Sequence, residues 1–162
     1  MKILVLSKTE FNNLMQKRNI NNDNVSDKNL YIISINDTEG IYKSSYFDGC
    51  ESENVLITRF DDTEEDQKLL DIKTGNHFFV KCMTEDQAKE IIKFLKKVII
   101  DDNTEIIIHC TAGQNRSASV GKFCVDYFGY DMDTFKLDNP RAQGNSTVSR
   151  LLNNEFYWSH YK

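Results

Sequence analysis

The sequence predicts that residues 1–162 form a single α/β domain with a central, mostly parallel, twisted sheet flanked by helices. Apolar runs with strand character alternate along the chain with segments whose apolar residues recur at helical spacing. The run from Glu105 to His109 is almost wholly apolar, which is typical of a central strand buried on both faces of a parallel sheet. The chain is long enough for one domain with its own core, and its sequence contains neither an internal repeat nor a linker.

Four strands are expected, each a short apolar run between polar or turn-forming residues. They lie at residues 2–6, 30–35, 54–60 and 105–109. The third strand runs into a strongly acidic segment at residues 61–66, which is typical of a solvated loop. Gly75 and Asn76 mark a turn before a further short apolar piece at residues 77–80. Loops are expected at residues 19–29, 36–53 and 131–145.

Two of the expected helices begin with capping-box sequences, in which side chains satisfy the free N–H groups of the first turn. Ser7 and Glu10 have this spacing, and so do Thr84 and Gln87. Apolar residues recur at helical spacing after each box, and they do so again in two later segments. The expected helices follow Ser7 and span residues 84–99, 118–128 (with Gly129 as its C-terminal cap) and 146–157.

Composition and charge restrict the classes of protein to which the chain can belong. A net charge of −5 argues against non-specific binding to nucleic acid or to an anionic membrane, because both favour a basic surface. No apolar run approaches the ~20 residues of a membrane helix, and the apolar start of the chain is too short for a signal peptide. The four cysteines have neither CxxC nor zinc-like spacing, which predicts free thiols and no bound metal. We therefore expect a cytoplasmic protein without nucleic-acid or membrane partners.

The stretch from His109 to Ser117 is typical of a phosphate-binding loop with a thiol at its base. Cys110 ends an expected strand and Arg116 opens an expected helix, so the residues between them form a tight loop. Backbone N–H groups of such a loop point inward, and the helix adds its positive N-terminal end. Gly113 allows a positive φ where the loop turns. The expected phosphate-binding residues are Thr111, Ala112, Gly113, Gln114, Asn115 and Arg116.

The side chains of this loop suit nucleophilic attack on phosphorus. Arg116 can hold two phosphate oxygens in a bidentate fork, and the positive field around it favours the thiolate of Cys110. Ser117 can donate a hydrogen bond to that thiolate, or later to the leaving sulfur. The expected product of the attack is a cysteinyl-phosphate intermediate. No metal or cofactor is required, because Arg116 and the backbone amides stabilise the charge.

Each of these residues also has an ordinary structural interpretation. Cys110 can be a buried core thiol, and Arg116 can be an ion-pair partner at a helix end. Ser117 can cap a helix, and His109 can be a hydrogen-bonded core histidine. Any one of them alone favours the structural interpretation, whereas their occurrence together in this order favours the catalytic one.

The nine residues from His109 to Ser117 read HCTAGQNRS, which resembles the His-Cys-x5-Arg-Ser/Thr signature of the cysteine-dependent protein tyrosine phosphatase superfamily. The chain length and the capped helix and strand before the motif resemble the compact dual-specificity-like members. The resemblance is strong from Thr84 to Phe128 and weaker upstream. It implies that Cys110 is the nucleophile and Arg116 the phosphate clamp. It further implies that Ser117 assists breakdown of the intermediate and that His109 supports the loop and the thiol.

Members of this superfamily also use an aspartic acid on a loop after an upstream strand to protonate the leaving oxygen. Asp61 and Asp62 follow the third expected strand and are the two main candidates. We prefer Asp62, because a residue just past the strand end can point freely into a loop, whereas Asp61 can anchor the turn. Asp66 and Asp86 are outside candidates. The separation from Cys110 is longer than compact members usually have.

The expected activity is hydrolysis of phosphotyrosine in proteins, with phosphoserine and phosphothreonine as further substrates. The variable loop positions carry no basic side chain, whereas family members that act on inositol phospholipids often have lysines there. The alternatives are a pseudophosphatase that binds phosphorylated partners, and a phosphatase for RNA 5′ ends or small phosphate esters. A sulfurtransferase or arsenate reductase would also use a thiolate in an anion loop, but the spacing of Arg116 and Ser117 favours phosphate. Asn139, Pro140 and Asn145 are expected either in an ordinary turn or in a loop near the active site.

Overall fold

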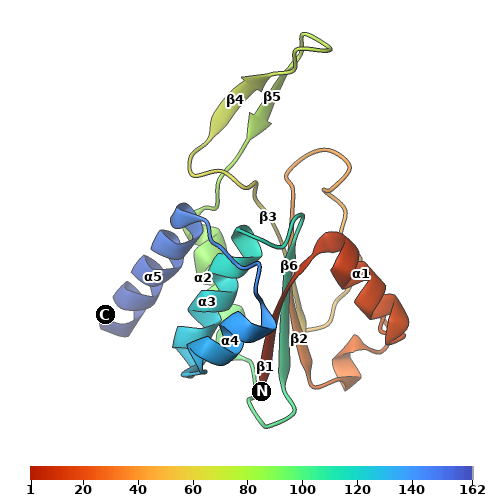
Figure 1. The fold of residues 1–162 in the computed structure, drawn as a ribbon, viewed down its shortest axis with the longest axis vertical. Helices are drawn as coiled ribbons and strands as arrows, with labels where there is room; N and C mark the ends of the chain where they lie inside the picture. The colour runs from red at the N-terminus through yellow and green to blue at the C-terminus, as the bar shows by residue number, and fades with distance from the viewer. Residues whose placement is uncertain (162) are drawn as a thin grey trace.

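The computed structural model describes residues 1–161, with the side chains of residues 1–159. Its central sheet has the strand order β1-β6-β2-β3, and every neighbouring pair is parallel. The strands are β1 (Lys2–Ser7), β2 (Leu30–Asn36), β3 (Val55–Arg59) and β6 (Glu105–Cys110). Figure 1 shows helices on both sides of this sheet. The predicted α/β class is confirmed, and β6 lies inside the sheet between β1 and β2.

The helices cover the two faces of the sheet unequally (Figure 1). They are α1 (Lys8–Lys17), α2 (Glu85–Lys96), α3 (Arg116–Phe128), α4 (Met132–Asp138) and α5 (Ser146–Tyr161), with a short 3-10 helix η1 (Val25–Asp27). On one face, Phe11 and Met15 of α1 form a buried cluster that includes Ile107 of β6. On the other face, Ile106 and Ile108 belong to the larger cluster with α2, α3 and α5.

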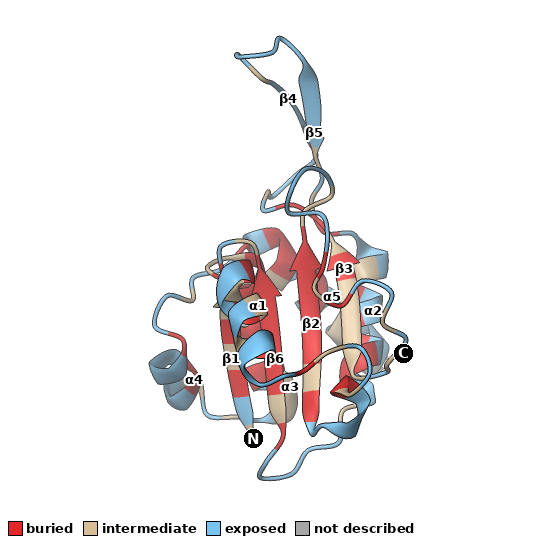
Figure 2. Cartoon of the chain, turned by 90° about the vertical axis from the view of Figure 1, so that its right-hand side faces the viewer, coloured by how far each residue is buried: buried red, intermediate tan, exposed pale blue. Residues whose placement is uncertain are grey.

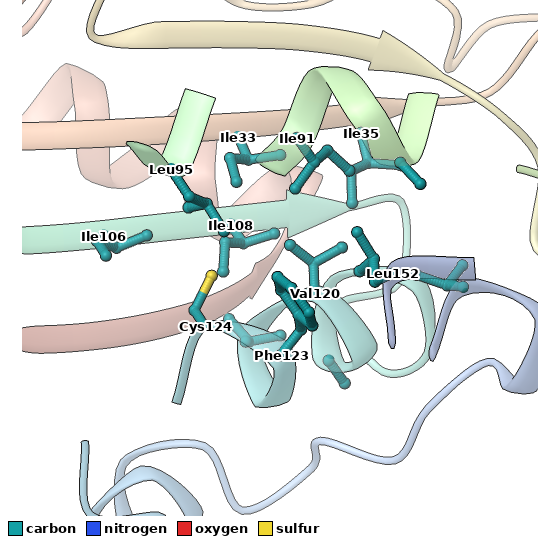
Figure 3. Packing of buried hydrophobic residues seen from close by; sticks show 14 of the residues in the cluster. Ile33, Ile35, Ile91, Leu95, Ile106, Ile108, Val120, Phe123, Cys124 and Leu152 are labelled. Carbon is teal, nitrogen blue, oxygen red and sulfur yellow. The ribbon is translucent and has the colours of Figure 1, made fainter. Parts of the chain in front are cut away.

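Strand β6 is therefore buried on both faces, as its apolar sequence predicts. Figure 2 shows the inner strands buried along most of their length. Figure 3 shows Ile108 packed among side chains of the surrounding helices, including Leu95, Val120 and Leu152. Because dense packing on both faces resists displacement, the carboxyl end of β6 holds Cys110 in a fixed place.

Both predicted capping boxes are present. Ser7 Oγ accepts from the Glu10 N–H (3.2 Å), and Glu10 Oε1 accepts from the Ser7 N–H (3.0 Å). Thr84 and Gln87 make the same pair of bonds at the start of α2. Because Ser7 both ends β1 and caps α1, the chain turns from strand to helix without a loop.

The edge strand β1 is covered by a side chain from after α4. Asn139 Oδ1 accepts from the Val5 N–H (2.7 Å), and Asn139 Nδ2 donates to the Ile3 carbonyl (2.9 Å). The amide therefore occupies backbone groups that would otherwise be open to another strand.

Two segments differ from the sequence expectations. Helix α2 ends at Lys96 and not at Ile99, because the last turn tightens: the Val98 N–H donates to the Leu95 carbonyl. Ile99 therefore does not pack on the helix face and is 73% exposed. The expected loop at residues 131–145 contains α4. Asp131 caps this helix by accepting from the Thr134 N–H (2.8 Å), and the buried ring of Phe135 anchors it.

A two-stranded hairpin projects from the domain above the carboxyl ends of the strands (Figures 1 and 2). It consists of β4 (Gln67–Leu70), which the sequence did not predict, and β5 (His77–Val80), and the two pair antiparallel. The turn expected at Gly75 is present, with φ at +72°. Among residues 1–161, none of the helices combines the length and the apolar character needed to cross a membrane.

Candidate active site

The loop between β6 and α3 places a thiol at its base. Cys110 is the last residue of β6 and is only 2% exposed. Its Sγ accepts from the Gly113 N–H (3.2 Å) and lies 3.0 Å from Ser117 Oγ. Both contacts place hydrogen-bond donors beside the sulfur, an arrangement that stabilises a negative charge there.

Gly113 is required by both its backbone conformation and its surroundings. Its φ is +71°, which L side chains rarely adopt. A Cβ at this position would lie 2.4 Å from the Ser7 nitrogen and 2.6 Å from the Leu6 carbonyl carbon. The loop therefore packs directly on the turn between β1 and α1. A further bond joins the same two segments, from the Lys8 N–H to the Thr111 carbonyl (3.2 Å).

Arg116 opens α3 and points back across the loop. It is 4% exposed, and its Nη1 donates to Asp37 Oδ1 (2.8 Å) and to the Phe60 carbonyl (2.8 Å). Its Nε is buried and has no hydrogen-bond partner among the described residues. A buried N–H without an acceptor is costly, and an oxyanion in the loop would supply the acceptor.

The N-terminus of α3 also lacks a side-chain cap. Asn115 stands at the capping position, but its side chain makes no capping bond. Its amide donates instead to Asp62 Oδ2 (2.8 Å). The N–H groups of the first helical turn are thus left for an anion, which the positive end of the helix also attracts.

The two candidate acids have different surroundings. Asp62 is exposed, and its carboxylate accepts from Asn115 Nδ2 on the loop and from Asn145 Nδ2 (3.0 Å) before α5. Asp61 is 7% exposed and accepts from Thr38 N–H (3.0 Å), Thr38 Oγ1 (2.6 Å) and Lys81 N–H (2.8 Å).

These surroundings favour Asp62 over Asp61 as a proton donor. Burial raises the pKa of Asp61, but the hydrogen bonds from Thr38 and Lys81, together with the charge of Arg116, outweigh burial and lower that pKa below its ordinary value. A carboxylate with a lowered pKa is protonated less often, which makes Asp61 the poorer proton donor. Asp62 is exposed, and its bond from Asn115 places its carboxylate beside the loop.

His109 is buried and neutral. Burial lowers its pKa to about 3, and the nearby charges of Lys8 and Arg116 act in the same direction. Its Nε2 lies 2.7 Å from Ser34 Oγ, its Nδ1 lies 3.4 Å from the Cys110 carbonyl, and its ring stacks on Phe11. The ring therefore lies against the backbone at Cys110 in its neutral form.

Asp37 belongs to this site and was not among the predicted residues. It follows β2, and its Oδ1 accepts from both Arg116 Nη1 and Thr111 Oγ1 (2.9 Å). In the sequence, Asp37 is an acidic residue directly after an expected strand, and this pattern alone does not place it at the site. Its place follows from the pairing of β2 with β6, which brings the carboxyl ends of the two strands together.

Lys8 is a second residue that the sequence did not single out. It is 9% exposed, and its Nζ donates to Asn36 Oδ1 (3.0 Å) and to the carbonyls of Tyr42 and Ser44. Burial lowers the pKa of this ammonium, although Asp37 opposes the effect. Lys8 thus fastens the segment after β2 beside the loop.

The segment after α4 lies behind the loop. The Gln143 N–H donates to the Gln114 carbonyl (2.7 Å). Asn145 accepts from two N–H groups in the first turn of α5, and its Nδ2 reaches Asp62. The segment therefore has two roles: Asn145 lies near the site, and Asn139 covers the edge of the sheet.

Among the described residues, no cluster of three or more His, Cys, Asp or Glu side chains is arranged to hold a metal ion.

Neither a family model nor a curated protein matches this chain. Solved structures do. The human tyrosine phosphatase-like serine/threonine/tyrosine-interacting protein superposes with a TM-score of 0.50 at 16% identity, covering 92% of this chain and 83% of that one. PTPMT1, solved in complex with PI(5)P, superposes with a TM-score of 0.51 at 11% identity, covering 98% of this chain and 94% of that one. The chain thus has the fold of the cysteine-dependent protein tyrosine phosphatase superfamily, as its motif predicts.

Proposed function

We propose that this chain, whose fold is that of the cysteine-dependent phosphatases, hydrolyses phosphotyrosine in proteins through a cysteinyl-phosphate intermediate. Phosphoserine and phosphothreonine are further substrates. One observation carries the proposal: the Cys110 thiol lies at the base of a loop in which the buried Nε of Arg116 and the uncapped end of α3 have no acceptor. A phosphoryl group bound in the loop above the sulfur would supply acceptors for these donors.

In the first step, Sγ of Cys110 attacks phosphorus as the thiolate, so that an S–P bond forms and the P–O bond to the substrate breaks. Asp62 gives its proton to the leaving oxygen, which departs as an alcohol or phenol. Arg116 and the loop amides hold the remaining phosphate oxygens and stabilise their charge. The positive charge comes from the chain itself, so the step needs neither a metal nor a cofactor.

In the second step, water attacks the phosphorus of the cysteinyl phosphate. Asp62, now ionised, accepts a proton from that water, and the P–S bond breaks to release inorganic phosphate. Ser117 Oγ, 3.0 Å from Sγ, donates to the sulfur as its negative charge returns. Asp37 acts through Arg116 and does not touch the phosphate. It accepts a hydrogen bond from Arg116 Nη1, which fixes the orientation of the guanidinium that holds the phosphate oxygens.

One feature supports a protein phosphoester over an inositol phospholipid. The four variable loop positions, Thr111, Ala112, Gln114 and Asn115, offer no cationic side chain for additional phosphates of a headgroup. PI(5)P is the ligand of one structural neighbour, PTPMT1, whose identity to this chain is 11%.

The experiment that tests this proposal is the pH dependence of kcat for a phosphotyrosine peptide, compared between the wild type and Asp62→Asn. Measurable turnover by the wild type separates a phosphatase from a module that only binds phosphorylated partners. In the variant, kcat is expected to fall by about 10²-fold, and the decline of kcat on the basic side of the profile is expected to disappear. The reason is that asparagine cannot supply the proton.

Asp61→Asn is the matched control. We expect it to loosen the contact to Lys81 and lower thermal stability, while the basic-side decline remains. If Asp62→Asn leaves the profile unchanged and Asp61→Asn removes the decline, the acid has been assigned to the wrong residue.

A further inference from the structure

A groove lies between the projecting hairpin and the segment after β2. It has a volume of about 330 Å³, and its walls come from β5 and the adjacent Lys81 on one side and from residues 38–39 on the other. No β4 residue lines it, so it lies along the outer side of β5. The lining residues are Thr38, Glu39, His77, Phe78, Phe79 and Lys81.

Both walls of this groove are joined to the candidate active site. Thr38 directly follows Asp37, which contacts Arg116 and Thr111. On the other wall, the Lys81 carbonyl accepts from the Asp61 N–H, and the Lys81 N–H donates to the Asp61 carboxylate. Asp61 is the neighbour of Asp62 in the chain. The Asp61 carboxylate also holds Thr38, so one buried side chain fixes the two walls beside the candidate acid.

The hairpin leaves two aromatic side chains partly exposed. Phe78 is 46% and Phe79 is 58% exposed, and the two point to opposite faces of the hairpin. Phe79 pairs with Lys68, whose Nζ lies 5.9 Å from the ring centre. An isolated two-stranded hairpin is marginal in water, and exposed apolar patches mark interaction surfaces.

We propose that this groove binds the residues that flank the phosphorylated side chain of a protein substrate. The inference rests on the proposed phosphatase function and extends it to substrate selection. An extended peptide can pair with the free edge of β5, which bonds to β4 on its other side. Phe79 then selects an apolar residue close to the phosphorylated one.

Charge favours a peptide over a lipid surface as the occupant. Glu39 lies in the groove opposite Lys81, and the acidic run at residues 61–66 enters the hairpin at its base. An anionic membrane would be repelled by this rim and by the net charge of −5. A neutral or basic peptide with one apolar anchor fits the same surface.

The test compares Phe79→Ser with the wild type on two substrates. One is a phosphotyrosine peptide with a leucine two positions from the phosphotyrosine, and the other is para-nitrophenyl phosphate. For the peptide, kcat/KM is expected to fall by about tenfold, mainly through a higher KM. For para-nitrophenyl phosphate, which cannot reach the groove, it is expected to stay within about twofold, which also shows that the variant is folded.

Ile99→Ser is the matched control. Ile99 is also apolar and exposed (73%), but it lies beside Tyr31 at the opposite end of the sheet, so its substitution should change kcat/KM for neither substrate. An unchanged peptide kcat/KM in Phe79→Ser would overturn the inference. So would a parallel loss on both substrates, since the hairpin would then support the catalytic loop instead.

A measurement of peptide binding tests the groove independently of the proposed phosphatase activity. If the wild type turns over neither substrate, the phosphatase proposal fails, and fluorescence anisotropy with the same peptide still reports on the groove. Phe79→Ser in a Cys110→Ser background is then expected to raise Kd by about tenfold. Binding of the wild type to anionic vesicles that is lost in Phe79→Ser would assign the patch to a membrane and contradict the proposal. A dimer that Phe79→Ser dissociates would assign it to a second copy and contradict it equally.

Discussion

Replacing Cys110 by serine is expected to reduce kcat for para-nitrophenyl phosphate by at least about 10³-fold. The hydroxyl fits the same space, 2% exposed and beside Gly113 N–H and Ser117 Oγ, so the fold and the anion loop should persist. Serine is a much weaker nucleophile here because no described side chain is placed to remove its proton. The buried His109 is unsuited to that role, because burial lowers its pKa to about 3, which makes it a weak base, and its Nε2 already lies 2.7 Å from Ser34 Oγ.

The measurement is steady-state kinetics on the purified variant, with competitive binding of vanadate to confirm that the loop is intact. Cys50→Ser is the matched control, since Cys50 is also a free thiol but contributes to the cluster under α1 and not to the loop. Full activity in Cys110→Ser would end the cysteine-dependent interpretation.

The second large effect concerns the phosphate clamp. Arg116→Lys is expected to lower kcat/KM by about 10³-fold while leaving the net charge unchanged. The three N–H groups of an ammonium radiate from one atom, whereas the guanidinium places Nη1, which contacts Asp37 and the Phe60 carbonyl, apart from Nε, which would donate to an anion. The loss should appear in kcat as well as KM, because the fork stabilises charge that spreads over the phosphate oxygens in the transition state.

Arg18→Lys is the matched control, because it makes the same substitution at a residue outside the candidate site. Arg18 pairs with Glu105 in a partly exposed ion pair at the opposite end of β6, so this variant should retain wild-type kinetics. Activity of Arg116→Lys within about threefold of the wild type would show that the arginine fork is not used for binding or catalysis.

The centre of the fold was predictable because its signals are local. These signals are the apolar run of β6, the two capping boxes and the glycine after α3. Each depends only on neighbouring residues in the sequence, and each of the predicted features is present. Helix α4 had such a local signal too, in Asp131 and Thr134, but the surrounding Asn and Pro residues favoured a loop. Its decisive contact, the Phe135 ring against Gly121, joins two helices and cannot be read from spacing.

The contacts that complete the site are long-range. Asp37 and Arg116 are 79 residues apart, and they meet because β2 lies beside β6. The choice between Asp61 and Asp62 was likewise open at the level of sequence, since the bonds from Thr38 and Lys81 decide which carboxylate is turned inward. The long separation between Asp62 and Cys110 also has a structural explanation, because the β4–β5 hairpin occupies part of it.

The central claim is that phosphate is carried on Cys110 during turnover. It is tested most directly by mixing the enzyme with a phosphotyrosine peptide, quenching the reaction in acid within milliseconds, and mapping phosphorylation by mass spectrometry. We predict a phosphoryl group on the peptide fragment that contains Cys110, absent before mixing and absent in Cys110→Ser. Turnover with no phosphorylated Cys110, or with the phosphoryl group on another residue, would contradict the claim.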